Sequence, residues 1–273
     1  MLKIRILTAC VLIACLVPAL FLLSATYWAY TMLSLSIVAL FEWGHLIKLN
    51  TIALIVYLLS IAMIGIYAVQ SIEQYGLHSF FYLSLSVFLL VSLFWLIIVP
   101  IWFKTKYIVT NKWLMGGLGF ILVGSLWLAL ICAKASNPWL LLALLASIWI
   151  SDSAAYFAGK AFGKNKLAPS FSPGKTWEGV GGALIGVTFF GIILYYGFNI
   201  NNFALFPALW MMTMLGVIGD LFESMLKRQA NIKDSGHILP GHGGLLDRID
   251  GNIPSLPIGL LMIYIYNFYT LAV

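Results

Sequence analysis

Long apolar runs separated by short polar turns dominate the chain from one end to the other. A helix needs about 20 apolar residues to cross the hydrocarbon core of a bilayer, and nine segments reach that length. They cover residues 5–24, 27–47, 51–70, 78–103, 113–133, 137–158, 179–199, 204–225 and 253–272. The pattern predicts an all-α, polytopic integral membrane protein with about nine transmembrane helices.

The composition excludes the other broad classes of protein. Of the 273 residues, 62% are hydrophobic and 9% are charged, whereas a soluble domain carries about 25% charged residues. The polar surface is too small to cover a soluble globule, and the apolar content is too high for a disordered chain. We treat residues 1–273 as a single transmembrane domain, with N-terminal helices in 1–135 and, in 136–273, helices and cytoplasmic loops that include the segment 224–250.

The distribution of Lys and Arg predicts the orientation. If the N-terminus is cytoplasmic, 14 of the 15 basic residues fall in cytoplasmic segments, and Lys134 is the exception. This bias is the positive-inside rule, and it places the C-terminus outside. It also explains the net charge of +6 without a nucleic-acid partner. The first run is longer than the core of a signal peptide, which has about 7–15 residues, so we expect a retained helix.

Two long cytoplasmic loops, residues 159–178 and 226–252, hold most of the polar chemistry. The segment 224–250 is the more polar of the two. The positive-inside rule explains its cations, but not the acids, histidines and glycines that are mixed among them. These residues are Lys227, Arg228, Lys233 and Arg248, then Asp234, Asp247 and Asp250, and His237, His242, Gly243 and Gly244.

Two carboxylates lie just upstream, within the eighth apolar run. A carboxylate at membrane depth is expensive and indicates a functional site by default. Asp220, Ser224 and Lys227 share one face of a helix, and we expect Asp220 to be a ligand. Glu223 and Lys227 are four residues apart, so a simple ion pair is the preferred interpretation of Glu223.

Asp247 and Asp250 are three residues apart, so a helical turn would direct both carboxylates to the same side. Grouped carboxylates bind hard cations such as Mg²⁺, which often share their ligands with substrate phosphates. Lys and Arg beside such a metal are the usual partners of phosphate oxygens. The pattern therefore indicates phosphoryl or nucleotidyl transfer at the cytoplasmic face.

The other loop supports the same chemistry. Asp152 ends the sixth run and is expected near the site, and Lys175 and Thr176 suit a phosphate. A P-loop is rejected because Pro169 replaces the required first glycine, and no strand is expected before it. The glycines at 179, 181, 182 and 186 predict close helix packing. For Glu42, beside His45, a satisfied polar contact or a helix-end position is preferred over catalysis.

The segment from Ser224 to Asp250 resembles the signature of the phosphatidate cytidylyltransferase family. It reads Ser-x-Leu-Lys-Arg-x4-Lys-Asp-x-Gly-x2-Leu-Pro-x-His-Gly-Gly-Leu-x-Asp-Arg-Ile-Asp. Residues 172–179 resemble the second landmark of that family, in which a Lys often stands at the place of Gly174. The resemblance spans the C-terminal half of the chain, while the N-terminal half matches only as a set of apolar helices.

The resemblance implies an activity and a set of roles. The family transfers CMP from CTP to phosphatidic acid in the lipid bilayer, uses Mg²⁺ with K⁺ as a second cation, and forms homodimers. It implies Asp220, Asp247 and Asp250 as metal ligands and the cytoplasmic face of a bacterial inner membrane as the location. It also implies catalytic roles for Ser224, Lys227, Arg228 and Arg248, and substrate contacts for Lys175, Thr176, Lys233, Asp234, His242, Gly243 and Gly244.

Two other interpretations remain open at this stage. A transporter with intramembrane carboxylates would use Asp220 and Glu223, but it would leave the polar segment 224–250 without a role. Another lipid-headgroup transferase, such as a CDP-alcohol phosphotransferase, would require a spaced Asp-Gly…Ala-Arg…Gly…Asp…Asp pattern, which this sequence lacks.

The predicted map can be tested with topology reporters. Reporters fused after residues 76 and 202 should report an external location, and those after residues 108, 168 and 236 a cytoplasmic one, because Lys and Arg are retained inside. Each fusion position is tested in intact cells with two reporter enzymes, one active only outside the cytoplasm and one active only inside it. A reversed reading at any of these five positions would refute the nine-helix map.

Overall fold

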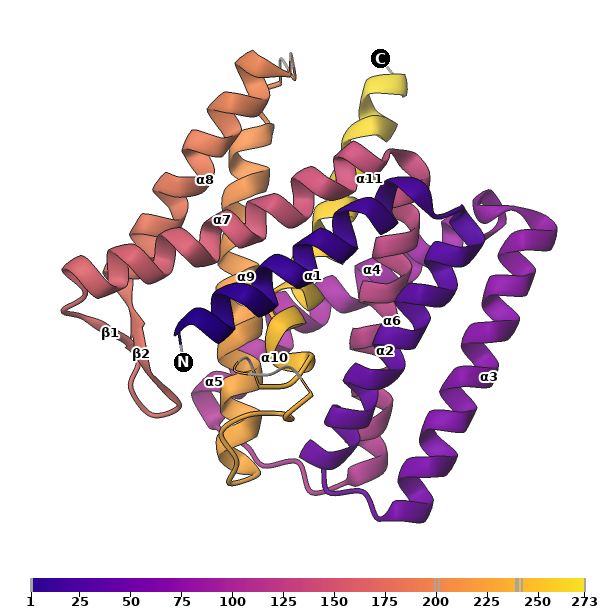
Figure 1. Ribbon diagram of the computed structural model, residues 1–273, viewed down its shortest axis with the longest axis horizontal. Helices are drawn as coiled ribbons and strands as arrows, with labels where there is room; N and C mark the ends of the chain where they lie inside the picture. The colour runs from indigo at the N-terminus through magenta and orange to yellow at the C-terminus, as the bar shows by residue number, and fades with distance from the viewer. Residues whose placement is uncertain (1, 199, 201, 239–240, 242, 273) are drawn as a thin grey trace.

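The computed structural model describes all residues except 1, 199, 201, 239–240, 242 and 273. The chain is almost entirely helical over this part (Figure 1). Its elements are α1 (Leu2–Leu22), α2 (Ala25–Leu46), α3 (Thr51–Tyr75), η1 (Leu77–Phe80), α4 (Phe81–Leu93), η2 (Phe94–Ile98), α5 (Val99–Thr105), α6 (Lys112–Ser136), α7 (Pro138–Phe162), β1 (Lys166–Ala168), β2 (Ser172–Thr176), α8 (Trp177–Gly197), α9 (Leu205–Gln229), α10 (Leu246–Ile249) and α11 (Asn252–Ala272).

Each of the nine predicted segments overlaps helical residues in the structure. Six helical stretches among the described residues are long and apolar enough to cross a membrane, so the protein is an integral membrane protein. The count of nine spans and the orientation of the termini remain predictions. The six stretches are Thr51–Tyr75, Leu77–Thr105, Lys112–Ser136, Pro138–Phe162, Trp177–Gly197 and Leu205–Gln229.

The connecting segments gather at two ends of the helical assembly (Figure 1). The loops between α2 and α3 and between α5 and α6, the β1–β2 hairpin and the segment between α9 and α11 occupy the lower half of the view. The turns between α1 and α2, between α6 and α7 and between α8 and α9 occupy the upper half. The β1–β2 hairpin, which belongs to the predicted loop 159–178, and the segment after α9 therefore lie at the same end of the helices.

The β1–β2 hairpin corrects the sequence analysis, which expected no strand before the Gly174–Lys175 region. β1 and β2 pair as antiparallel strands, with Lys166 opposite Thr176 and Ala168 opposite Ser172. Apolar periodicity did not show these strands because they are short, polar and lie outside the membrane-spanning segments. Glu178 closes the base of the hairpin by accepting hydrogen bonds from the backbone and side chain of Asn165.

The glycines of α8 allow the close packing on α7 that the sequence predicted. A Cβ at Gly179 would meet the carbonyl oxygen of Ala155 at 3.0 Å, and one at Gly186 would lie 2.7 Å from the Cβ of Ala154. Gly182 faces Ala158 in the same way. Gly181 points into open space, so the prediction fails at that position alone among the four glycines.

An aromatic cluster holds α9 against the interrupted helix that runs from α4 to α5. The ring of Phe222 lies edge-on to the rings of Phe94, Trp95 and Trp102, with centroids 5.2–5.7 Å apart. The wide π-helical turn η2 supplies two of these rings. Pro100, two residues after η2, lacks the N–H that a regular α-helical bond would need. Such edge-to-face contacts stabilise a buried aromatic group beyond its burial alone.

α9 also packs closely against the start of α11, where the backbone of Gly219 faces the carbonyl oxygen of Asp250. A Cβ at Gly219 would overlap that oxygen and would lie 2.9 Å from Cγ of Pro254. Nearby, the Ser255 hydroxyl donates hydrogen bonds to the carbonyls of Met212 and Gly251. Small residues at a helix crossing permit this approach in a membrane.

Gly219→Ala should therefore destabilise the protein, because the added methyl group overlaps the backbone of Asp250. Overpacking of this kind costs about 1–3 kcal/mol, and thermal unfolding in detergent should show a lower midpoint. Gly181→Ala is the matched control, because no atom lies within 4 Å of its added Cβ. Equal midpoints for the two variants would contradict this account of the α9–α11 contact.

Candidate active site

A charged cavity of about 590 Å³ opens among α7, the β1–β2 hairpin, α8, α9 and the segment that contains α10. The β1–β2 hairpin and the segment between α9 and α11, which supply part of its lining, both lie in the lower half of Figure 1. Five carboxylates and four cationic side chains line it. They are Asp152, Asp220, Asp234, Asp247 and Asp250, with Lys160, Lys175, Lys227 and Arg248.

α9 lines the cavity through Gly216, Val217, Asp220 and Lys227, and Ser224 and Glu223 are partners of the last two. Ser224 Oγ donates a hydrogen bond to Asp220 Oδ1 at 3.3 Å, as the predicted shared helix face requires. Glu223 forms the expected ion pair with Lys227, at 3.2 Å between Nζ and Oε2. Both side chains of that pair are nearly buried, with exposures of 5% and 11%. The packing of Phe222 and Gly219, between and beside these residues, fixes the direction in which they point.

Lys175 joins the hairpin to α9. It lies at the end of β2, and its ammonium is 2.6 Å from Oδ2 of Asp220. The next residue, Thr176, is buried and caps α8 by accepting a hydrogen bond from the backbone of Gly179. The short hairpin thus places the ammonium of Lys175 beside a carboxylate that is 45 residues away in sequence. Both residues line the cavity.

Asp247 accepts hydrogen bonds from three described residues, Lys227, Ser235 and Gly244. Its Oδ1 lies 2.5 Å from Nζ of Lys227, and its Oδ2 accepts from the amides of Gly244 at 2.8 Å and Ser235 at 3.0 Å. Burial alone would raise the pKa of Asp247. The hydrogen bonds from Lys227, Gly244 and Ser235 outweigh burial and hold that pKa below its ordinary value. Asp247 therefore remains a carboxylate at neutral pH.

Asp250 has the opposite environment although it is only three residues away. Its side chain accepts a hydrogen bond from the amide of Gly251 at 2.7 Å. Burial first, and then the negative charge of Asp220, raise the pKa of Asp250 above its ordinary value. A cation placed among these carboxylates would relieve that repulsion. The structure confirms that Asp247 and Asp250 face one cavity.

The donor set fits a divalent cation that arrives with a phosphorylated substrate. No group of three acidic, histidine or cysteine side chains in the described part of the chain converges to hold a metal ion by itself. Mg²⁺ is commonly bound by one or two carboxylates together with substrate phosphates and water. Asp220, Asp247 and Asp250 provide such oxygen ligands around the cavity.

Other residues selected from the sequence lie away from this cavity. Arg228 donates to the carbonyls of Phe171 at 3.4 Å and Ile232 at 3.3 Å, and Lys233 is exposed. Gly243 has a positive φ of 83°, and a Cβ there would lie 2.6 Å from Oδ2 of Asp247. Gly244 contacts the same carboxylate through its amide. His242 lies outside the described residues.

α7 contributes more to the cavity than the sequence indicated. Asp152 lines it as expected, and Tyr156 and Lys160 follow on the same face at helical spacing. The i, i+4, i+8 spacing of these three residues was visible in the sequence. Polar residues at the end of an apolar run are, however, also typical of a helix that ends at the membrane–water interface. Glu42 makes the satisfied polar contact near a helix end that the sequence analysis preferred, but the sequence did not indicate that its partner is the loop that carries Asp247.

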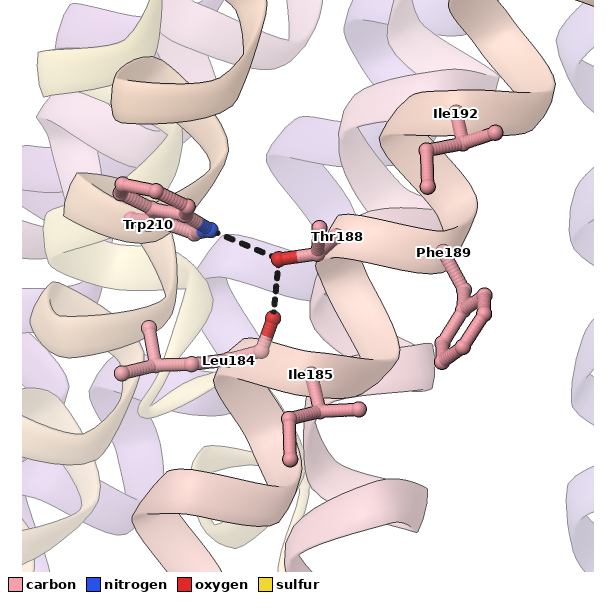
Figure 2. Close-up of a pocket in the computed structure, with 6 residues that line it drawn as sticks. All are labelled: Leu184, Ile185, Thr188, Phe189, Ile192 and Trp210. Carbon is pink, nitrogen blue, oxygen red and sulfur yellow. Dashed lines mark hydrogen bonds between the residues drawn. The ribbon is translucent and has the colours of Figure 1, made fainter.

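A second cavity, of about 360 Å³, is apolar and lies between α8 and α9. Figure 2 shows the indole of Trp210 donating to the Thr188 hydroxyl, which in turn donates to the carbonyl of Leu184. The remaining lining side chains are Ile185, Phe189 and Ile192. None of the six residues that line this cavity has a titratable side chain.

Comparison with known proteins is consistent with this site. Residues 3–266 match the model of the Cytidylyltransferase family. A phosphatidate cytidylyltransferase of Pseudomonas aeruginosa is 33% identical over 94% of this chain and 95% of its own length. One from Haemophilus influenzae is 34% identical over 94% and 96%, respectively. One from Brucella melitensis is 47% identical over 40% of each chain.

Proposed function

The chain belongs to the cytidylyltransferase family, and we propose that it is an enzyme that joins CTP to phosphatidic acid, forming CDP-diacylglycerol and pyrophosphate. One observation carries the proposal beyond family membership: two lysines from different elements are ion-paired with carboxylates inside one cavity. A site that binds two polyanionic substrates needs such fixed cations, because substrate repulsion is the main barrier to bringing the phosphates together.

The reaction needs positioning more than a strong base. The phosphate of phosphatidic acid already carries an anionic oxygen, which attacks the α-phosphorus of CTP in line while pyrophosphate leaves. Lys175, Lys227 and Arg248 surround the space where the phosphates would meet. Lys227 is held between Glu223 and Asp247, so its ammonium is fixed before substrate binds. Fixed charges of this kind stabilise a transition state without reorganisation.

Asp220, Asp247 and Asp250 would hold the divalent cation that we assign as Mg²⁺, with K⁺ as the second cation that the family resemblance implies. When bound, Mg²⁺ neutralises phosphate charge and helps pyrophosphate to leave. Lys175 and Lys227, which lie beside Asp220 and Asp247, would contact the substrate phosphates from these positions. Thr176 and Asp234 line the cavity where they would contact substrate.

The location of the cavity agrees with the nature of the two substrates. The phosphate of a lipid lies at headgroup depth, and CTP is dissolved in the cytosol, so the reaction requires a site at the membrane interface. The polar loops gather at one end of the helices (Figure 1), and the Lys and Arg distribution assigns that end to the cytoplasm. We propose this face of a bacterial inner membrane, with nine spans and a homodimeric assembly.

A transporter is less well supported than the enzyme. Transport sites lie near the bilayer midplane at broken helices. Here Asp220 of α9 instead lines a cavity completed by the hairpin and by the segment that contains α10. The full-length relatives are named as phosphatidate cytidylyltransferases, which also favours the enzyme.

The purified protein should convert labelled CTP into a lipid only when phosphatidic acid and Mg²⁺ are both present. Asp247→Asn should abolish this conversion, because the amide loses the charge that binds Mg²⁺ and pairs with Lys227. The variant should still fold, since Lys227 keeps its contact with Glu223, and size-exclusion chromatography checks this. Lipid formation without phosphatidic acid would refute the activity, and near-normal turnover would remove Asp247 from the site.

Arg248 should differ sharply from a basic residue that only follows the positive-inside rule. Arg248→Ala should lower kcat/KM by at least about tenfold, because a charge-assisted phosphate contact is lost. Lys104→Ala should stay within about twofold, because an exposed charge contributes little. Steady-state kinetics of both variants in one detergent measure the difference. Equal losses would mean that the cations act by general surface attraction.

A further inference from the structure

Glu42 is a buried carboxylate in the N-terminal half of the chain, whereas the described residues that line the cavity all lie between Ser151 and Asp250. It lies near the end of α2 and is only 2% exposed. Oε1 accepts a hydrogen bond from the amide of Leu245 at 3.0 Å, and Oε2 accepts one from the amide of Leu246 at 2.8 Å. These two amides immediately precede Asp247, so Glu42 holds the backbone that presents it.

Ser235 connects Glu42 directly to Asp247. Its hydroxyl donates to Oε2 of Glu42 at 3.2 Å, and its backbone N–H donates to Oδ2 of Asp247 at 3.0 Å. Ser235 therefore donates a hydrogen bond to each of the two carboxylates. The loop wraps tightly around Glu42, since a Cβ at Gly236 or Gly244 would overlap its carboxylate.

α2 is a rigid base for this contact. The residue next to Glu42, Trp43, is buried, and its indole donates to the carbonyl of Met115 on α6 at 2.9 Å. The indole ring also lies against Gly119, where a Cβ would meet it at about 2.5 Å. The packing of Trp43 on α6 therefore fixes the part of α2 that carries the Glu42 carboxylate. A site is more precise when its supporting residues are held on rigid elements in this way.

A buried carboxylate is costly unless hydrogen bonds replace its hydration, and among the described residues Glu42 accepts its three hydrogen bonds from the loop that carries the site. We infer that Glu42 is a positioning residue for the reaction, which fixes residues 235–246 so that Asp247 faces Lys227 and the substrate phosphates. This inference rests on the proposed function, and it makes the N-terminal helices part of the active-site structure.

Glu42→Gln is the direct test, because Gln has the same length but loses the charge and one acceptor. Glu73→Gln is the matched control, since Glu73 is an exposed carboxylate on α3. In Glu42→Gln, kcat should fall by about 10- to 100-fold, as expected for misplaced catalytic groups. KM for CTP should change little, because the groups that bind CTP remain present. Glu73→Gln should keep both constants.

Hydrogen exchange in detergent separates positioning from general stability, and it needs no substrate. In Glu42→Gln, the amides of Leu245 and Leu246 should exchange about 10- to 100-fold faster, because they lose bonds to a charged acceptor. The amides of α6 and of the middle of α2 should keep their protection. Loss of protection throughout the chain, or an unchanged kcat, would overturn the inference.

Ser235→Ala provides a second variant if Glu42→Gln does not fold. It removes only the hydroxyl that donates to Glu42 and keeps the backbone bond to Asp247. We expect kcat to fall by at least about threefold, with unchanged KM for CTP, since one neutral bond is lost. Unchanged kcat would overturn the inference. A wild-type protein that makes no CDP-diacylglycerol would instead refute the proposed function, and the exchange measurements would still test the loop contact.

Discussion

The ammonium of Lys227 is the interaction on which the rest of the site depends. It lies 3.2 Å from Glu223 on its own helix and 2.5 Å from Asp247, which is 20 residues further along the chain. Without this cation, two carboxylates would face each other in a nearly buried environment, where an unpaired charge is severely unfavourable. The pair therefore fixes where the loop after α9 returns to the helices, and Asp247 is held in its charged state as a result.

The surrounding packing keeps that geometry within narrow limits. Phe222 locks α9 against the aromatic rings of η2 and α5, and Gly219 lets the same helix approach the backbone of Asp250. On the opposite side, the glycines of α8 bring α7 close, so that Asp152 and Lys160 reach the cavity. The contacts between the apolar helices thus fix the positions of the charged side chains that line the cavity.

The N-terminal half takes part in the same structure through Glu42. Its carboxylate and that of Asp247 bind adjacent parts of one loop, and each accepts hydrogen bonds from backbone amides that no helix satisfies. Unsatisfied buried amides are costly, so the loop has a strong preference for this single path. A helix that looks like an ordinary membrane span therefore contributes to the position of groups that lie about 200 residues later in the sequence.

The sequence by itself determined the class of protein and the region of its chemistry. Apolar runs of membrane-spanning length predicted the helices, and the mixture of acids and cations in residues 224–250 indicated a phosphate-binding site, because both depend on local spacing alone. The ion pair of Glu223 and Lys227 followed from the helical period for the same reason. The tertiary structure decided which residues meet across the chain: Lys175 with Asp220, Lys227 with Asp247, and Glu42 with Leu245 and Leu246. It also turned Arg228 toward the carbonyls of Phe171 and Ile232 and revealed the short hairpin. These outcomes depend on close helix packing and on the return path of the loops, which bring together residues whose separation in sequence has no fixed period.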